Sequence, residues 1–153
     1  MFVLDPDVVS ELRKGKAGQA DRHVAAWASG VPAEVLFVSA ITILELATGV
    51  LLVRHHDPRQ GAMLRVWLDH HVLPAFSGRV QPVETAVAQR SAALHVPDPR
   101  SVRDVLIAAI AMVHNMTVVT RNGADVAATG VALLNPWDPA VPPLRRKVPR
   151  PRG

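Results

Sequence analysis

The chain opens with Met1-Phe2-Val3-Leu4-Asp5-Pro6-Asp7-Val8-Val9-Ser10-Glu11-Leu12, and the predicted architecture follows from this stretch. Its first four residues are apolar and long enough for a buried strand, and from position 8 onward apolar residues recur at helical spacing. Pro6 suits a first helical turn, because its missing N–H is not needed there. The stretch therefore predicts a strand, then Asp5 at its C-terminal end, then a helix over 6–14. Open α/β sheets bind ligands at that edge.

The rest of the chain alternates short apolar, β-branched runs with helical patterns. We expect strands at 35–38, 80–83, 116–119 and 131–134, and helices at 19–28, 40–55, 57–73, 84–94 and 102–114. Ser39 and Ser101 are the expected N-caps of two of these helices, and helix 40–55 is apolar enough to be largely buried. Because strands and helices alternate, the expected fold class is α/β, a three-layer α/β/α sandwich with a mainly parallel sheet.

The composition is that of one domain without thiol chemistry. With 153 residues, 49% of them hydrophobic, the chain can form one core. It has no cysteine, which excludes disulfides, thiolate metal sites and thiol nucleophiles. We see no signal peptide and no apolar run near the ~18 residues of a membrane span. We therefore expect a cytoplasmic protein that does not contact membranes.

The net charge of +4 comes from the C-terminus. Residues 138–153 are Pro-rich and carry five basic residues against one acid, which leaves residues 1–137 electrically neutral. We divide the chain into a folded domain over 1–137 and a basic, disordered tail over 138–153. Such a tail either holds an RNA backbone by counterion release or is simply a solvated terminus.

Four acidic residues stand apart from the ordinary surface acids. Asp5 and Asp125 follow apolar strands, Glu45 lies inside an apolar helix, and Asp104 opens another helix. Alone, each has a structural explanation: a helix cap for Asp5 or Asp104, an ion pair for Glu45, a turn for Asp125. If the strand ends lie side by side, however, these carboxylates converge and repel. A hard cation such as Mg²⁺, or Mn²⁺, would relieve that repulsion, activate water and neutralise a phosphodiester.

Four segments also carry motifs of one known family. The first is Asp5-Pro6-Asp7-Val8-Val9-Ser10-Glu11, against the pattern D-T-N-V-x-S-E, and the second is Ser39-Ala40-Ile41-Thr42-Ile43-Leu44-Glu45-Leu46-Ala47-Thr48-Gly49, against S-A-I-T-x-x-E-L-x-x-G. The others are Asp104-Val105-Leu106-Ile107-Ala108-Ala109 and Thr120-Arg121-Asn122-Gly123-Ala124-Asp125, followed by a Leu-Leu-Asn-Pro-Trp ending at 133–137. With four motifs in order over 1–137, the chain resembles the PIN-domain ribonucleases, specifically the VapC-type toxins of bacterial toxin–antitoxin systems.

The resemblance implies a function and a set of site residues. It implies a Mg²⁺-dependent endoribonuclease, a hydrolase acting as a toxin on RNA, which forms a homodimer and binds a cognate antitoxin. Asp5, Glu45 and Asp104 correspond to the metal-site acids of the family, and Asp5 and Asp104 are the expected direct ligands. Either Asn122 or Asp125 completes the site, since relatives place the fourth acid at one position or the other.

Two residues depart from the first motif. Pro6 replaces a threonine and removes a hydroxyl and an N–H, while Asp7 replaces an asparagine and adds a negative charge beside Asp5. Asp7 either joins the metal shell or weakens activity by repulsion. These departures keep a second function open, in which a catalytically weak PIN domain acts as a binding module in an antitoxin complex on operator DNA.

Three further features have both a structural and a functional interpretation. The pairs His55–His56 and His70–His71 point about 100° apart on a helix, so we interpret them as solvated rather than as metal ligands. Arg121 is the expected cation at the site edge, for an RNA phosphate or an acidic neighbour. Three apolar residues of the helix expected over 57–73 belong either to the core or to an apolar groove that binds another chain: Met63, Trp67 and Leu68.

Overall fold

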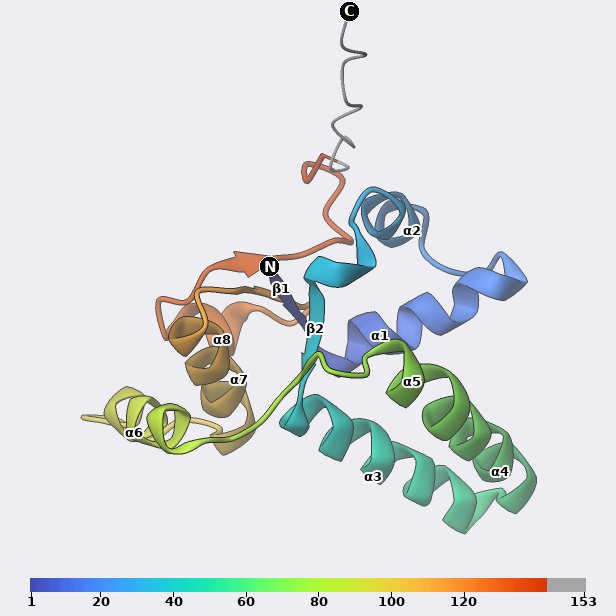
Figure 1. The fold of residues 1–153 in the computed structure, drawn as a ribbon, viewed down its shortest axis with the longest axis horizontal. Coiled ribbons are helices and arrows are strands. Elements are labelled where there is room, and N and C mark those ends of the chain that lie inside the picture. Colours follow the sequence, from blue (N-terminus) through green and yellow to red (C-terminus); the bar gives the residue numbers. More distant parts are fainter. Residues whose placement is uncertain (143–153) are drawn as a thin grey trace, which may run out of the picture.

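The structure is a computed structural model that describes residues 1–142, and its five strands there form one parallel sheet in the order β3-β2-β1-β4-β5 (Figure 1). β1 lies at the centre and pairs in parallel with both β2 and β4. The predicted parallel sheet is therefore confirmed, although its outer strands are shorter than expected. The strands are β1 (Phe2–Leu4), β2 (Leu36–Ser39), β3 (Val80–Gln81), β4 (Thr117–Val119) and β5 (Leu133–Leu134).

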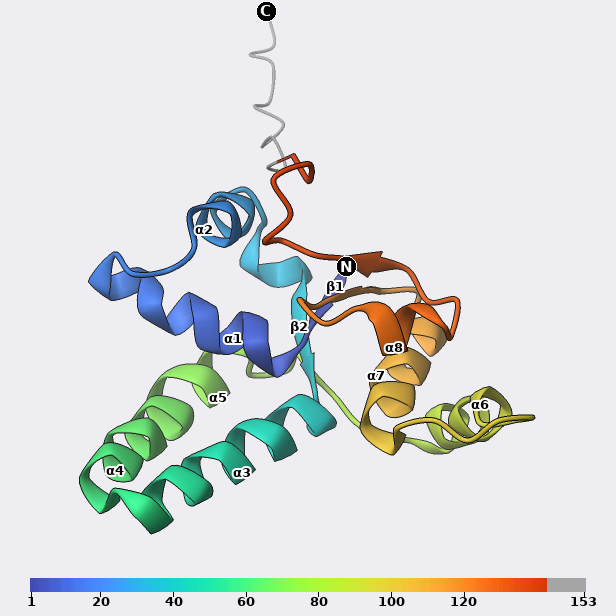
Figure 2. The same cartoon turned by 180° about the vertical axis from the view of Figure 1, so that it is seen from behind.

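Helices cover both faces of the sheet (Figures 1 and 2), which confirms the three-layer α/β/α sandwich. One layer holds α1 (Pro6–Arg13), α2 (Arg22–Ser29), α3 (Ala40–His56), α4 (Pro58–Trp67) and α5 (Leu73–Ala75). The other holds α6 (Thr85–Leu94), α7 (Val102–Val113) and α8 (Ala124–Ala127). None of the described helices is both long and apolar enough to cross a membrane.

Neighbouring residues of one strand face opposite layers, as the pleat requires. Val3 and Val118 pack in the core beneath α6, α7 and α8. Leu4, Val38 and Val119 pack in the core beneath α1, α2 and α3. All five side chains are fully buried, so the register of the three central strands is fixed. Their carboxyl ends, and the polar residues that follow, therefore occupy fixed positions along one edge.

The helix starts show which predicted caps form. Ser39 caps α3, because its Oγ accepts the backbone N–H of Thr42 at 3.0 Å. The helix predicted over 19–28 begins only at Arg22, since Asp21 caps it by accepting the N–H groups of His23 and Val24. Ser101 stands at the N-cap position of α7, as predicted. Its exposed side chain makes no capping hydrogen bond, however, so the prediction that it caps the helix was wrong.

Three segments differ from their prediction. The helix expected over 57–73 is interrupted by a π-helical turn at Leu68–Val72, in which Leu68 and Val72 are buried. Asp125, for which a turn was one interpretation, instead lies in the first turn of the short helix α8. Helix α3, expected to be largely buried, leaves three leucines at least half exposed, because one of its faces alone packs on the core: Leu44, Leu51 and Leu52.

The predicted tail is described in part. Residues 138–142 follow β5, and Val141 packs against the α1–α3 core. Residues 143–153, which hold the five basic side chains of the tail, lie outside the described residues.

Candidate active site

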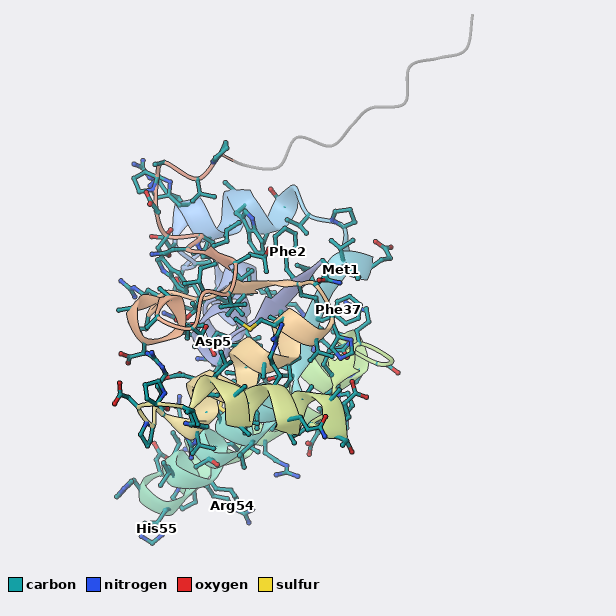
Figure 3. The ribbon with its side chains drawn as sticks, turned by 90° about the vertical axis from the view of Figure 1, so that its left-hand side faces the viewer. Met1, Phe2, Asp5, Phe37, Arg54 and His55 are labelled. Carbon is teal, nitrogen blue, oxygen red and sulfur yellow. The ribbon has the colours of Figure 1, made fainter. Side chains whose placement is uncertain are left out.

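Asp5 lies at the carboxyl end of the central strand and is held from the neighbouring strand. It occupies the N-cap position of α1 but makes no side-chain capping bond. Instead its Oδ2 accepts the hydroxyl of Thr120, which follows β4, at 2.7 Å. Figure 3 shows Asp5 near the middle of the molecule, with Met1 and Phe2 at the other end of β1. The helix-cap explanation of Asp5 is therefore excluded by the structure.

The surroundings of Asp5 disfavour its negative charge. Burial raises its pKa to about 7, against the opposing hydrogen bond from Thr120. The negative charges of Asp7, Glu45 and Asp104 each raise this pKa further. Carboxylates from α1, α3 and α7 therefore all act on the charge of Asp5.

Glu45 has a cationic partner, as expected for a carboxylate in an apolar helix. Its Oε1 lies 3.5 Å from Nη1 of Arg103, in the first turn of α7. Burial raises the pKa of Glu45, while the attraction and hydrogen bonding of Arg103 oppose this rise, and the charge of Asp104 adds to it. Arg103 thus ties the two acid-bearing helices α3 and α7 together at the site.

Asp7 bridges two segments through both of its oxygens. Oδ1 accepts the N–H of Val8 at 2.8 Å, and Oδ2 accepts the N–H of Arg121 at 3.0 Å. Burial raises the pKa of Asp7, and these N–H bonds oppose the rise. The sequence did not indicate this bridge or the bond from Thr120. The threonine that opens the fourth motif was the available signal for the latter.

The structure separates the predicted site residues into two groups. Asp5, Glu45 and Asp104, together with Asp7, interact through their charges. Asn122 and Asp125 are exposed and belong to the segment after β4. The backbone N–H of Asn122 donates to Oγ1 of Thr120 at 3.2 Å, whereas Asp125 lies in the first turn of α8. Either one remains a candidate for completing the site.

The acid cluster is wider than the coordination shell of a single ion. Among residues 1–142, no three Asp, Glu or His side chains lie close enough together to hold one metal ion directly. The donors are nevertheless all carboxylate oxygens, and their mutual repulsion favours a cation. Mg²⁺ keeps several of its own waters in proteins and is bound through one or two carboxylates. A hard cation at this cluster would therefore be bound by only one or two of the carboxylates, with water as its remaining ligands.

The histidine pairs do not join the cluster. The rings of His55 and His56 lie edge to face, 5.3 Å apart, and both side chains are exposed. Figure 3 shows His55 at the far end of α3, well away from Asp5. His70 and His71 are also exposed. The interpretation of these residues as solvated is consistent with their positions.

A second feature is an apolar groove between α1 and the segment from α4 to α5, with a volume of about 420 Å³. Met63 and Trp67 line it, as the sequence suggested, but Leu68 is buried in the core instead. Basic residues lie at the groove as well: the guanidinium of Arg13 stands 5.6 Å from the ring centre of Trp67, and Lys16 is close by. The groove is therefore apolar with a cationic rim.

Comparison with known proteins identifies the family. A sequence profile described as the PIN domain matches residues 2–130. This chain belongs to the PIN-domain family. Its central parallel sheet and the helices on both faces are thus those of a PIN domain. The resemblance drawn from the four motifs is confirmed.

Full-length relatives are similar to this PIN domain. "VapC ribonuclease Y4jK" of Sinorhizobium fredii is 36% identical over 92% of this chain and 100% of its own length. "Toxin FitB" of Neisseria gonorrhoeae is 34% identical over 90% of this chain and 99% of its own. The crystal structure of FitAcB from Neisseria gonorrhoeae superposes with a TM-score of 0.80 at 33% identity, covering 90% of this chain and 99% of that chain.

Proposed function

We propose that this PIN domain is a Mg²⁺-dependent endoribonuclease and the toxin of a type II toxin–antitoxin system. The observation that carries the proposal is Asp5, fixed by Thr120 on the central strand and surrounded by the charges of Asp7, Glu45 and Asp104. Two relatives, a VapC ribonuclease and the toxin FitB, support the same function. Because its substrate would be cellular RNA, the proposed location is the cytoplasm.

Each site residue has its own role in the proposed reaction. Asp5 and Asp104 would hold Mg²⁺, or Mn²⁺ in its place, with Glu45 in or beside its shell. When bound, the ion supplies water activation and neutralises charge on the phosphodiester. Thr120 keeps the Asp5 carboxylate oriented, and Arg103 keeps Glu45 directed toward α7. Near neutral pH Asp5 must give up a proton before it can bind a cation.

RNA cleavage by purified protein tests the proposal. Wild type with Mg²⁺ should cut structured RNA, and Asp5→Asn should reduce the rate by about 100-fold or more, since it removes a metal-holding carboxylate. Asp69→Asn is the matched control, because Asp69 is a surface acid paired with Arg65 at 2.8 Å. Chelation of divalent ions should stop cleavage by wild type. Equal rates for wild type and Asp5→Asn would contradict the assigned site.

The second candidate function, a binding module on operator DNA, is favoured by two observations. Pro6 removes a hydroxyl and an N–H from the turn next to Asp5, which weakens the case for catalysis. A structure titled "FitAB bound to IR36 DNA fragment" superposes on this chain with a TM-score of 0.80 at 32% identity. If neither wild type nor Asp5→Asn cuts RNA while an antitoxin complex shifts promoter DNA, this second function is the correct one.

We further propose that the apolar groove binds the antitoxin. Its lining of Leu12, Met63 and Trp67 suits the apolar face of a helix, and the cations Arg13 and Lys16 suit acidic residues beside that face. The similar solved structures include the toxin–antitoxin complex VapBC2 from Rickettsia felis, which at 19% identity and a TM-score of 0.62 supports the fold alone. The occupant should therefore be an amphipathic, acidic helical segment.

Co-purification tests the groove. The candidate partner is any small protein encoded directly beside this chain; it is expressed together with the tagged chain and captured through the tag. Met63 is 70% exposed, so Met63→Glu should leave the fold intact but remove the partner. Val83→Glu, an exposed apolar site before α6 and outside the groove, is the control and should retain it. If Met63→Glu retains the partner, the antitoxin binds elsewhere on the surface and the groove is not its binding site.

A further inference from the structure

Beyond the acid cluster, Arg121 and Trp137 form a stack at the same edge of the sheet. The Cζ atom of Arg121 lies 5.2 Å from the ring centre of Trp137. Arg121 directly follows Thr120, the residue that holds Asp5, and its side chain is exposed. Trp137 follows β5 and is half-buried against the α1–α3 core. The stack therefore pairs a partly buried aromatic ring with an exposed arginine side chain.

The backbone of both partners is held in place. The N–H of Arg121 donates to Oδ2 of Asp7 at 3.0 Å, and the N–H of Trp137 donates to Oδ1 of Asn135 at 3.0 Å. β4 and β5 are also joined where they end, since the N–H of Thr120 donates to the carbonyl of Leu134 at 3.0 Å. Because both backbones are already fixed, a ligand that binds to these two side chains does not have to order the segments that carry them.

The charge of Arg121 is partly compensated, but its side chain is exposed to solvent. Arg121 acts electrostatically on Asp7 and on Asp21, so part of its positive charge is already engaged. A phosphate would compete with both carboxylates for that charge. A nucleobase needs only the flat guanidinium, and exposed bases of RNA do stack on aromatic rings and on arginine planes.

We propose that Arg121, stacked on Trp137, is the binding site for one unpaired RNA base next to the phosphodiester cut at Asp5. The inference rests on the proposed ribonuclease function and adds a base-binding subsite to it. Stacking tolerates every base, so this subsite selects unpaired RNA over a continuous duplex rather than one sequence over another. It thus directs cleavage toward loops, where a base is free to leave its neighbours.

Removal of single bases from a substrate tests the subsite. First, the sites at which wild type cuts total bacterial RNA are mapped at nucleotide resolution. A short hairpin that contains one of these sites is then synthesised. The hairpin is then made in versions that lack one base at each position near the cut, and binding is measured in an Asp5→Asn background. At one position the missing base should weaken binding about tenfold. Arg121→Lys, which keeps the charge but loses the plane, should reduce this effect to about twofold or less, and so should Trp137→Leu.

The outcomes separate the two proposals. Arg65→Lys, on the exposed face of α4, is the matched control and should keep the full effect of the missing base. If Arg121→Lys weakens binding equally with intact and base-free hairpins, Arg121 contacts a phosphate, and the stacking site is refuted while the ribonuclease function stands. If wild type cuts no RNA at any position, the proposed function and this inference fail together.

Discussion

Asp5 receives opposite influences from Thr120 and Asp7. The hydroxyl of Thr120 donates to it and stabilises the charged form, whereas the negative charge of Asp7 opposes that form. The family motif has an asparagine where this chain has Asp7. The substitution therefore brings a charge to the site and replaces the amide donor of asparagine with a second acceptor, and both oxygens of Asp7 accept backbone N–H groups.

Two substitutions should shift the pKa of Asp5 in opposite directions. Asp7→Asn removes a like charge and should lower this pKa, while Thr120→Val removes a donor to the carboxylate and should raise it. Carboxyl resonances followed by NMR through a pH titration of the metal-free protein would measure both. Shifts in the same direction, or no shift for Asp7→Asn, would contradict the assigned environment.

Residue types were easier to predict at this site than their contacts. The spacing of Asp5, Glu45 and Asp104 along the motifs indicated the acids that influence one another in the structure. The bonds of Thr120 and Asp7 depend instead on how closely the end of β4 approaches the start of α1. No local sequence pattern predicts this contact, because the bonded residues are separated by 115 positions in one case and by 114 in the other.

At the scale of elements, α3 and α4 form a hairpin whose close packing depends on one glycine. Gly61 in α4 is buried, and a Cβ added there would overlap the backbone of Arg54 in α3. Gly49 in α3 is exposed and has open space around it. The same residue type thus has a packing role at one position and none at the other, which sequence alone does not distinguish.

Alanine at these two glycines should change stability with opposite sign. Gly61→Ala forces α3 and α4 apart and should lower the free energy of unfolding by about 1–3 kcal/mol. Gly49→Ala should raise it by up to about 1 kcal/mol, because alanine favours a helix interior. Thermal or urea unfolding of the two variants beside wild type measures the difference. A gain in stability for Gly61→Ala would show that the hairpin can open without cost.

The prediction for α3 illustrates where hydrophobic pattern stops being informative. Apolar runs and capping residues predict the strands and helices around α3, and Ser39 caps α3 as expected. An apolar helix can, however, be buried by its own fold or by another chain, and both leave the same sequence pattern. The exposed leucines at 44, 51 and 52 lie along one side of the helix, as their spacing of seven and eight residues requires.

At the scale of the whole molecule, this leucine stripe is the expected contact of a homodimer. We expect wild type to have twice the mass of the chain in solution. Leu51→Glu places a charge in the stripe and should yield monomers, whereas Val83→Glu, exposed on another part of the surface, should not. Light scattering after size-exclusion chromatography gives the mass. An unchanged dimer with Leu51→Glu, or a monomeric wild type, would remove the stripe from the interface.

The acid cluster should also affect the stability of the whole fold as the pH changes. The folded-state pKa of Asp5, about 7, lies above its ordinary value of 3.8, so the folded chain holds this proton more tightly than the unfolded chain. The resulting cost is absent below about pH 4, grows as the pH rises, and is fully present above about pH 7. Metal-free wild type should therefore lose stability over that interval.

Asp5→Asn removes this cost and should make the metal-free protein more stable at about pH 8, by roughly 1–3 kcal/mol, with little change at about pH 4. Mg²⁺ should then stabilise wild type at the higher pH more than the variant, because a ligand stabilises the state that binds it. Melting temperatures at both pH values, with and without the ion, check both statements. A carboxylate that lowers the stability of the metal-free fold is expected to have a functional role. If the variant is instead less stable than wild type at about pH 8 without metal, Asp5 stabilises the fold and the assigned role in cation binding is contradicted.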